Sequence, residues 1–184
     1  MAQNIIGKSS TIHDYSAATG VTAGSGPLTI DGDFTTYWEC RAIENGSYPE
    51  CVGHRTTSYL YSSHTLVKQY TITRVVGKFY WALYISSGAS SNTGGVWTQI
   101  DIYRDGAWET IPGTYEVRSS SSGYINLDVS GLSLERVTKV RAYINAHGDK
   151  QCCDACGGST TAYGRIYELE AYASNDDAGY CCII

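Results

Sequence analysis

The stretch Leu28-Thr29-Ile30-Asp31-Gly32-Asp33-Phe34-Thr35-Thr36-Tyr37-Trp38 decides how the rest of the chain is interpreted. Its Asp-Gly-Asp centre predicts a tight turn, because glycine adopts positive φ without steric cost and aspartate bonds its own nearby backbone. Two threonine hydroxyls beside two carboxylates supply hard oxygen atoms, which are the ligands that Ca²⁺ prefers. A polar turn that leads into a buried Trp38 is the simpler interpretation of the same residues. The spacing is not that of an EF-hand loop.

The amino-acid composition predicts strands and turns rather than helices. The 184 residues include 16 Tyr, 4 Trp and 20 Gly but only 1 Met, and aromatic residues favour strands. We expect one domain over residues 1–184, with a core over 28–173, an irregular N-terminal lead-in and a Cys-containing tail over 174–184. A net charge of −5 without a basic run argues against nucleic acid as the main ligand.

Hydrophobic periodicity, together with β-branched and aromatic residues, predicts about eight short strands. The strand-like segments are residues 59–61, 69–76, 78–85, 96–103, 108–111, 114–118, 124–129, 137–145 and 164–173. Asp105-Gly106 signals a two-residue hairpin between two of them, whereas residues 132–135 are expected to form one helical turn. The fold class that follows is all-β, an antiparallel β-sandwich or jelly roll.

Alternation within three of these segments predicts two faces for each strand, one of them buried. The opposed sets are Thr98, Ile100 and Ile102 against Gln99 and Asp101; Val140, Ala142 and Ile144 against Lys139, Arg141 and Tyr143; and Tyr167, Leu169 and Ala171 against Ile166, Glu168, Glu170 and Tyr172. Trp97 and Trp108 are expected to be core residues, because both lie inside strand motifs.

Seven cysteines are many for a cytosolic protein and favour an oxidising setting. Cys40 and Cys51 bracket a ten-residue loop and predict a local disulfide. The other candidates for disulfide bonds form a second cluster: Cys153, Cys156, Cys181 and Cys182. Zinc binding by this cluster is the alternative. We favour disulfides, because vicinal cysteines are awkward as paired zinc ligands.

The two ends of the chain carry few targeting signals. Residues Met1 to Lys8 lack the charged and apolar regions of a signal peptide, and no apolar run reaches the ~18 residues of a membrane span. The final Cys181-Cys182-Ile183-Ile184 matches a prenylation box, but acidic residues precede it instead of a polybasic second signal. We expect an extracellular or virion protein that leaves the cell by another route, such as lysis.

Motifs that mark common enzyme classes are absent from the sequence. There is no Gly-x-Ser-x-Gly elbow, no glycine-rich phosphate loop and no His-Glu-x-x-His zinc motif. The acidic residues are scattered rather than paired as glycoside hydrolysis requires. We therefore expect binding rather than catalysis, and we name no catalytic residue.

Four segments, taken in order, resemble the discoidin domain, also called the coagulation-factor C-type domain, of the galactose-binding-like β-sandwich group. The segments are Ile30–Trp38, Tyr70–Val75, Trp97–Trp108, and Val140–Ile144 with Arg165–Tyr172. The chain departs from the family pattern by one extra residue after Trp97, which predicts a bulge there. It also has Ala173 in place of a final glycine, and its Cys-rich loop and tail are additional.

This resemblance implies a structural Ca²⁺ near the first motif and the last strand of the sandwich. By position, the implied ligands are the Asp33 carboxylate, the Thr36 hydroxyl, the Glu168 carboxylate and backbone carbonyls around Ile30. Glu168 shares a strand face with Glu170, so one carboxylate can approach an edge loop without burying a lone charge. A solvated Glu168 that binds no metal is the alternative.

The resemblance also implies binding of glycans, phospholipid head groups or proteins through loops at one end of the sandwich. The candidate loops are 41–55, 86–95 and 146–163, which lack the exposed Leu, Phe or Lys clusters of membrane binding. Sugars need planar aromatic rings and hydrogen-bonding side chains, and the candidates are Tyr48, His54, Arg55, Asn92, His147 and Tyr163. A glycan-binding module is the first hypothesis. A self-assembling virion decoration protein or filament subunit, joined through its cysteines, is the second.

Overall fold

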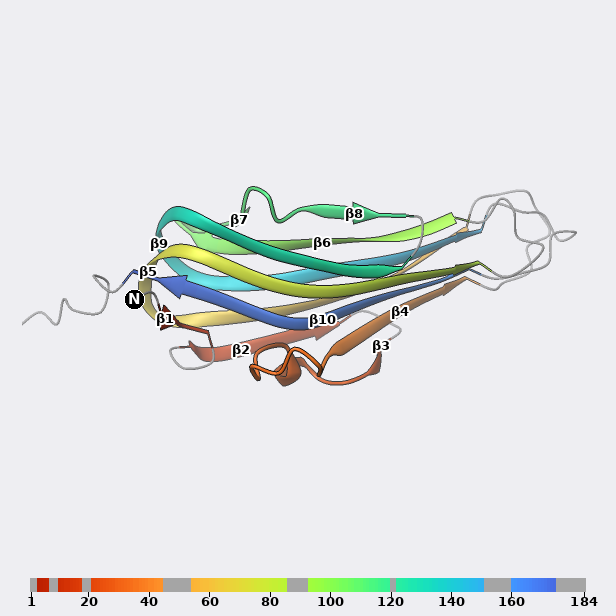
Figure 1. Cartoon of the computed structure of the whole chain (residues 1–184), viewed down its shortest axis with the longest axis horizontal. Helices are drawn as coiled ribbons and strands as arrows, with labels where there is room; N and C mark the ends of the chain where they lie inside the picture. The colour runs from red at the N-terminus through yellow and green to blue at the C-terminus, as the bar shows by residue number, and fades with distance from the viewer. Residues whose placement is uncertain are drawn as a thin grey trace, which may run out of the picture.

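The described part of the chain is almost entirely β-structure (Figure 1). The structure is a computed structural model that describes residues 3–6, 10–17, 21–44, 54–85, 93–119, 122–150 and 160–174. Within these residues the elements are β1 Gln3–Asn4, β2 Ser10–Ala17, β3 Val21–Ala23, the 3₁₀ helix η1 Gly26–Thr29, β4 Trp38–Glu44, β5 His54–Ile85, β6 Thr93–Arg104, β7 Ala107–Thr110, β8 Glu116–Arg118, β9 Gly123–Lys150 and β10 Thr160–Ala173. No helix in these ranges is long and apolar enough to cross a membrane.

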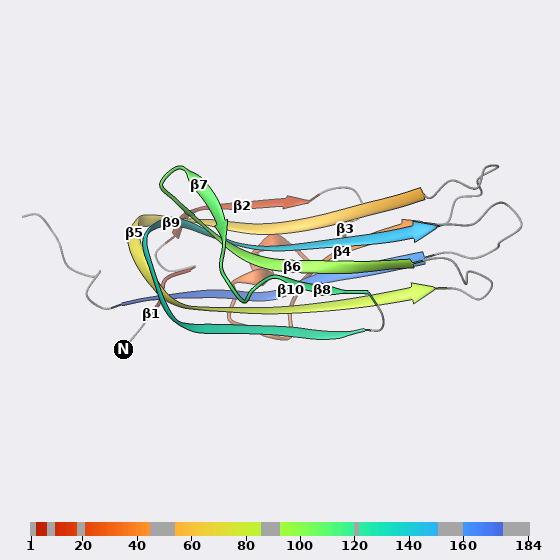
Figure 2. The same ribbon diagram turned by 90° about the horizontal axis from the view of Figure 1, so that it is seen from above.

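Hydrogen bonds join the strands into one antiparallel sheet that folds over into two layers (Figures 1 and 2). The two longest strands, β5 and β9, bend where their mutual pairing is interrupted, between Thr65 and Arg74 of β5. The first layer consists of β2, residues 54–66 of β5, residues 137–150 of β9, β6, β7 and β8. The second layer consists of residues 123–134 of β9, residues 70–85 of β5, β10, β4, β3 and β1.

Side chains from both layers meet in one hydrophobic core. Its fully buried members include Leu60, Ile100, Val140, Ala142 and Ile144 from the first layer, and Ile72, Phe79, Ile166 and Leu169 from the second. Burial of each large apolar side chain stabilises the fold by about 1.5–3 kcal/mol. The predicted antiparallel β-sandwich is confirmed, and so are the predicted inward faces of segments 98–102 and 140–144.

Strand β10 departs from the predicted alternation. Its pairing with β5 shifts register between Ile166 and Glu168, and both Ile166 and Leu169 are fully buried. The prediction that Ile166 lies opposite Leu169 is therefore wrong, because an extra residue in a strand breaks the period of two. The bulge predicted after Trp97 is not found, since β6 pairs with β7 and β9 without a register shift.

Residues 132–135 belong to β9 and not to the predicted helical turn. Leu132 and Leu134 pack against the core while their neighbours are exposed, which is the two-residue period of a strand. The hairpin signal at Asp105-Gly106 is confirmed: these residues have φ of 51° and 85° and connect β6 to β7.

Cys40 on β4 is a free, fully buried thiol. Its Sγ donates a long hydrogen bond, 3.7 Å, to the carbonyl oxygen of Ser58, and burial raises the pKa of the thiol to about 12. The predicted Cys40–Cys51 disulfide is not formed, because an inward-facing strand position directs Sγ into the core. The other predicted disulfide residues lie outside the described residues: Cys51, Cys153, Cys156, Cys181 and Cys182.

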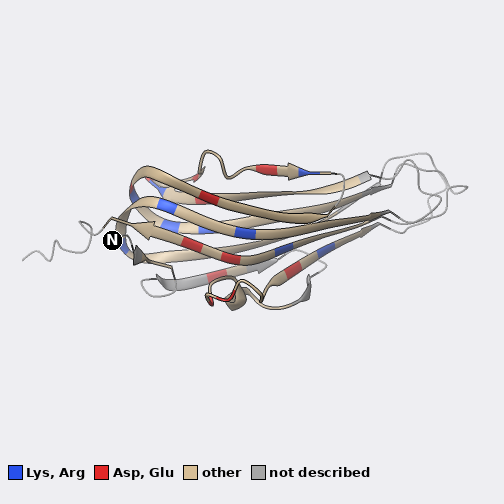
Figure 3. Ribbon diagram, in the orientation of Figure 1, with Lys and Arg blue, Asp and Glu red and all other residues tan. Residues whose placement is uncertain are grey.

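Charged residues of both signs are spread along the strands (Figure 3). Several ion pairs connect neighbouring strands, such as Arg74 Nη2 of β5 with Asp128 Oδ2 of β9, 2.7 Å apart. Both side chains of this pair are exposed, and exposed ion pairs contribute only about 0–1 kcal/mol to stability. More deeply buried pairs occur on the outer face of each layer, beside clusters of aromatic rings.

Candidate functional site

The outer face of the first layer carries aromatic and polar side chains from three adjacent strands. Alternation buries Leu60, Ile144 and Ile100, so the residues on either side of each point outward. The strand registers then set Tyr61 of β5 beside Tyr143 of β9, and Tyr143 beside Gln99 of β6. Residues 38 to 82 positions apart in the sequence thereby come to lie in one row.

These side chains line a pocket of about 360 Å³, called here the first pocket. Its lining residues are Tyr59, Tyr61, Trp97, Gln99, Arg141 and Tyr143. The rings of Tyr59 and Tyr61 are nearly parallel, with an interplanar angle of 5° and centroids 6.1 Å apart, and the Tyr143 ring centroid is also 6.1 Å from that of Tyr59. Such flat aromatic surfaces can pack against the apolar face of a sugar ring.

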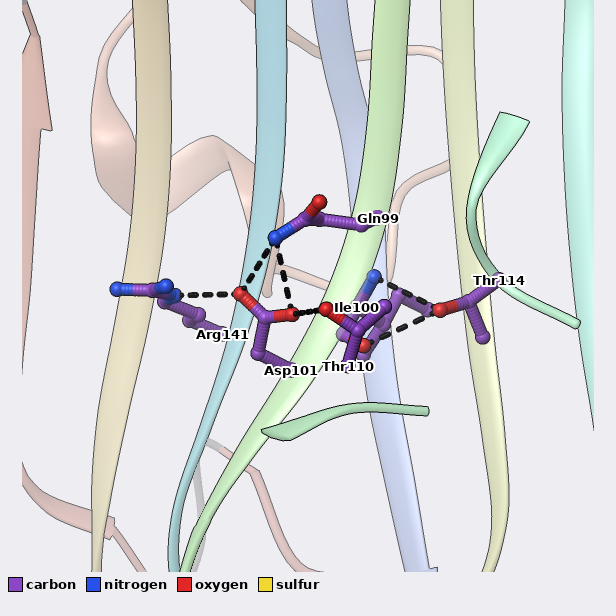
Figure 4. A network of polar contacts seen from close by, with 6 residues as sticks. All are labelled: Gln99, Ile100, Asp101, Thr110, Thr114 and Arg141. Atoms are coloured by element: carbon purple, nitrogen blue, oxygen red, sulfur yellow. Dashed lines mark hydrogen bonds and ion pairs between the residues drawn. The ribbon is translucent and has the colours of Figure 1, made fainter. Parts of the chain in front are cut away.

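A buried carboxylate fixes the polar side of the first pocket (Figure 4). Asp101 is only 1% exposed and accepts hydrogen bonds from Gln99 Nε2 at 3.0 Å, Thr110 Oγ1 at 2.8 Å and Arg141 Nε at 2.7 Å. Because these donors surround the carboxylate, its charge is compensated and Arg141 is held in one orientation. Thr114 in the same view secures the adjacent turn by accepting from Ile100 N and donating to Ile100 O, both at 3.1 Å.

Arg141 keeps hydrogen-bonding capacity for a ligand. Its Cζ lies 4.1 Å from the Trp108 ring centroid and 5.9 Å from that of Tyr61. Only Nε has an acceptor among the described residues, which leaves both terminal nitrogens as donors for ligand oxygens. Asn145, next to Tyr143 on the same face, donates to the Tyr143 hydroxyl at 3.0 Å, and its Oδ1 has no donor within the described ranges.

Trp97 and Trp108 are not core residues, contrary to the prediction. Both are half-buried and lie on the outer face of the first layer. The reason is visible in the alternation itself: Ile100 faces the core, so Trp97, three residues earlier, faces outward with Gln99. The alternation of inward and outward residues along this strand could therefore have predicted that Trp97 faces outward.

Of the six predicted ligand-binding residues, the side chains of two are described, and these two lie on different layers. His147 lies at the edge of the first pocket, with its ring centroid 5.5 Å from that of Trp97, whereas Tyr163 lies on the outer face of the second layer. His54 and Arg55 belong to β5, and only their backbone is described. Tyr48 and Asn92 lie outside the described residues.

Glu168 of β10 is a buried carboxylate beside the Asp31-Gly32-Asp33 turn. It is 1% exposed, and its Oε2 accepts a hydrogen bond from Gly32 N at 3.0 Å. No Lys or Arg of the described ranges forms an ion pair with it. Burial, with a smaller contribution from the negative charges of Glu170 and Asp31, raises the pKa of Glu168 to about 8, against the lowering effect of the Gly32 N–H. A cation at this place would remove an unfavourable buried charge.

The neighbouring loop offers oxygen atoms, though not quite as predicted. Thr36 Oγ1 donates to Asp31 Oδ2 at 2.7 Å and to the Asp33 carbonyl oxygen at 3.1 Å. Asp33 Oδ1 instead accepts from Thr35 N at 2.8 Å and Thr35 Oγ1 at 2.6 Å, which lowers the pKa of Asp33. Asp31, which the sequence-based prediction omitted, is therefore the loop carboxylate whose charge acts on Glu168.

The predicted metal ligands Asp33, Thr36, Glu168 and Ile30 remain a prediction. Ile30 follows η1 and donates its N–H to the Pro27 carbonyl oxygen at 3.3 Å. Across the described ranges, no group of three or more His, Cys, Asp or Glu side chains gathers around one point. A Ca²⁺ ion accepts hydroxyl and carbonyl oxygens as well, so Glu168, Asp31 and the loop oxygens fit such an ion.

Comparison with known proteins gives matches in structure only. No protein-family model and no curated protein matches the sequence. TmCBM61 in complex with β-1,4-galactotriose has a TM-score of 0.47 at 10% identity, over 94% of this chain and 99% of that one. CBM32-3 from a family 31 glycoside hydrolase of Clostridium perfringens has a TM-score of 0.35 at 14% identity, over 94% and 95%.

The tailspike protein 4 enzymatically active domain of bacteriophage CBA120 matches over 86% of this chain and 19% of its own, with a TM-score of 0.37 at 12% identity. Several of the similar structures are thus carbohydrate-binding modules with β-sandwich folds. Because these scores lie below 0.5, the ligand of this chain has to be inferred from its own residues.

Proposed function

We propose that the protein is a non-catalytic carbohydrate-binding module whose first pocket holds a neutral saccharide. The observation that carries this proposal is the combination of tyrosine and tryptophan rings with a fixed Arg141–Asp101 pair on one sheet face. A sugar ring has an apolar face that packs on aromatic rings and a rim of hydroxyls that needs donors and acceptors. The volume of about 360 Å³ falls within the range of small-ligand sites, about 300–1,000 Å³.

The charge balance of the first pocket favours a neutral ligand. The positive charge of Arg141 is compensated by Asp101 at 2.7 Å, so an anionic or cationic ligand would find no unpaired opposite charge among the described lining residues. None of the described residues that line the pocket is Asp or Glu, and glycoside hydrolysis usually requires a pair of carboxyl groups across the bond that is cleaved. Binding without catalysis is the function that these residues support.

We further propose that a structural Ca²⁺ binds between Glu168 and the loop that contains Asp31 and Thr36. The support for this proposal is the buried, unpaired Glu168 carboxylate next to hard oxygen atoms. The ion would neutralise Glu168 and hold the loop against β10. Glycans are displayed on cell surfaces, so the location that goes with this function is outside the cell or on a virus particle.

The test is a binding measurement with neutral oligosaccharides, first on a glycan array and then by calorimetry with the best ligand. We expect Trp97→Ala and Tyr61→Ala to weaken binding about 30-fold, since loss of a ring contact costs about 2 kcal/mol. Tyr115→Ala is the matched control, because Tyr115 is 56% exposed and lies outside the pocket. The proposal is wrong if no neutral saccharide binds, or if both pocket variants bind as tightly as the control.

A further inference from the structure

The outer face of the second layer carries another pocket, on the side of the sandwich opposite to the first. This second pocket has a volume of about 290 Å³ and is lined by Arg41 of β4, Tyr80, Ala82 and Tyr84 of β5, and Tyr163 and Arg165 of β10. The strands keep the same alternation here, because Ala42, Phe79 and Ala162 are buried on the inner face. The protein therefore presents two aromatic pockets that face in opposite directions.

Strand register explains why the second layer is hollowed at this point. Ala82 of β5 pairs with Tyr163 of β10, and Tyr163 pairs with Arg41 of β4. Ala82 has the smallest side chain of these three neighbouring residues. Tyr80 and Tyr84 lie two residues before and two residues after Ala82, so all three side chains are on the same face of β5. Tyr84 is 60% exposed. Its ring meets that of Tyr163 edge-on, with centroids 5.4 Å apart. The rings of Tyr80, Tyr84 and Tyr163 thus surround the small side chain of Ala82, which leaves a depression in the surface.

Two guanidinium groups converge on the same carboxylate beside this pocket. Glu39, 2% exposed, contacts Arg41 Nη2 through Oε1 at 3.4 Å and Arg165 Nε through Oε2 at 2.5 Å. Tyrosine rings hold both cations in place: Arg41 Cζ is 4.3 Å from the Tyr163 ring centroid, and Arg165 Cζ is 4.3 Å from that of Tyr37. Planar guanidinium groups supported in this way are preorganised to bind a planar anion.

The second pocket differs from the first in its charge. Arg41 and Arg165 face one carboxylate, Glu39, so these three groups sum to +1, whereas Arg141 and Asp101 beside the first pocket sum to zero. Of the two terminal Arg41 nitrogens, only Nη2 has an acceptor among the described residues, so Nη1 keeps its donors, and the side chain is 33% exposed. The second pocket therefore has both a surplus positive charge and unused donors, and an anionic group would satisfy both.

We propose that the second pocket binds carboxylate-bearing sugar residues of an acidic polysaccharide. A uronic acid residue offers a ring face for Tyr84 and Tyr163 and a carboxylate for the free donors of Arg41. The proposal goes beyond the neutral-saccharide function of the first pocket, because the two faces would bind sugars of different charge. One molecule could then hold a neutral and an acidic glycan at the same time.

The experiment measures binding of the full chain to polygalacturonate, alginate and hyaluronan by affinity electrophoresis and calorimetry, at low and at physiological ionic strength. Methyl-esterified polygalacturonate is the matched ligand without charge, and dextran sulfate is the anion without carboxylate. We expect binding to the carboxylate polymers, which weakens with salt but persists, and little binding to the other two. Stronger binding to dextran sulfate than to all three carboxylate polymers would overturn the proposal.

Protein variants then locate the site. Arg41→Gln and Tyr84→Ala should each weaken binding to the acidic polymer about tenfold, while Trp97→Ala should leave it unchanged. Arg136→Gln is the control, because it removes a 63% exposed guanidinium that pairs with Asp105 at the β6–β7 hairpin and is not among the residues that line either pocket. Circular dichroism and melting curves verify that every variant is folded.

The outcomes separate this proposal from the proposed function. If neutral saccharides bind but none of the acidic polymers does, the second pocket is refuted and the first stands. If acidic polymers bind through Arg41 while no neutral saccharide binds, the reverse holds. Equal losses in Arg41→Gln and Arg136→Gln would show attraction to overall charge and would refute a site at the second pocket.

Discussion

Glu168 makes a prediction about the pH dependence of stability. Burial raises its pKa from 4.5 to about 8 in the folded protein, so the folded state binds this proton more tightly than the unfolded chain does. Stability from Glu168 is therefore fully present below about pH 4.5 and is lost as the pH rises towards 8. Since one pKa unit corresponds to about 1.4 kcal/mol, the loss is at most about 5 kcal/mol, a large part of the usual 5–15 kcal/mol of a domain.

The assay is urea unfolding followed by tryptophan fluorescence, in the presence of a chelator, at pH 5 and at pH 8. We expect the wild type to be several kcal/mol less stable at pH 8, and Glu168→Gln to lose much less, because its amide does not ionise. Glu170→Gln is the matched control on the same strand, since Glu170 is half-buried and accepts a hydrogen bond from the Tyr172 hydroxyl at 2.8 Å. The control should keep most of the pH dependence of the wild type, because the charge of Glu170 raises the pKa of Glu168 less than burial does.

Added Ca²⁺ extends the same experiment. The ion binds the ionised carboxylate, so at pH 8 it should restore stability to the wild type by about 2.7 kcal/mol at 100 times its dissociation constant. Glu168→Gln should gain little. Equal wild-type stability at pH 5 and pH 8 in chelator would refute the argument from a buried charge. An equal effect of Ca²⁺ on wild type and Glu168→Gln would refute the proposed metal site.

Three further predictions concern the core and its turns. Phe79→Ala should cost about 3–5 kcal/mol of unfolding free energy, because the ring is fully buried; a loss below 1 kcal/mol by urea unfolding would contradict its place in the core. Gly24→Ala should destabilise more than Gly106→Ala, for which the positive φ alone costs about 1–2 kcal/mol. Both glycines have positive φ, but only at Gly24 would a Cβ lie 1.9 Å from the Tyr37 carbonyl oxygen; equal melting temperatures for the two variants would contradict this. Cys40 should resist iodoacetamide in the native protein and react in denaturant, as peptide mass spectrometry can show, and native labelling would contradict its burial.

Strand alternation determined much of the fold in advance, because side-chain direction along a strand depends only on local backbone geometry. The buried faces of residues 98–102 and 140–144 and the hairpin at Asp105-Gly106 could be predicted for this reason. Tyrosine enrichment and the absence of catalytic motifs likewise pointed to binding. The error on Trp97 arose from treating a strand tryptophan as a core residue against its own alternation.

The pairing of distant strands could not be derived from the sequence. Which tyrosines share a pocket depends on the register between β5, β9 and β6 on one face, and between β4, β10 and β5 on the other. The predicted site combined His147 and Tyr163, whose strands lie in opposite layers. Both residues are near the predicted loop over 146–163, and the sequence does not show which layer each end of that loop joins.

The chain by itself thus determined its all-β class, the inward faces of residues 98–102 and 140–144 and the chemical class of side chain available for a ligand, but not strands β2 and β4, which lie in the predicted lead-in and loop. Only the tertiary structure decided that β5 and β9 bend to serve both layers, that a bulge in β10 accompanies the burial of Glu168 beside Asp31, and that Arg41 and Arg165 share one carboxylate. The physical reason is that alternation is a local property of the backbone, whereas register and charge pairing between strands are set by the packing of the whole core.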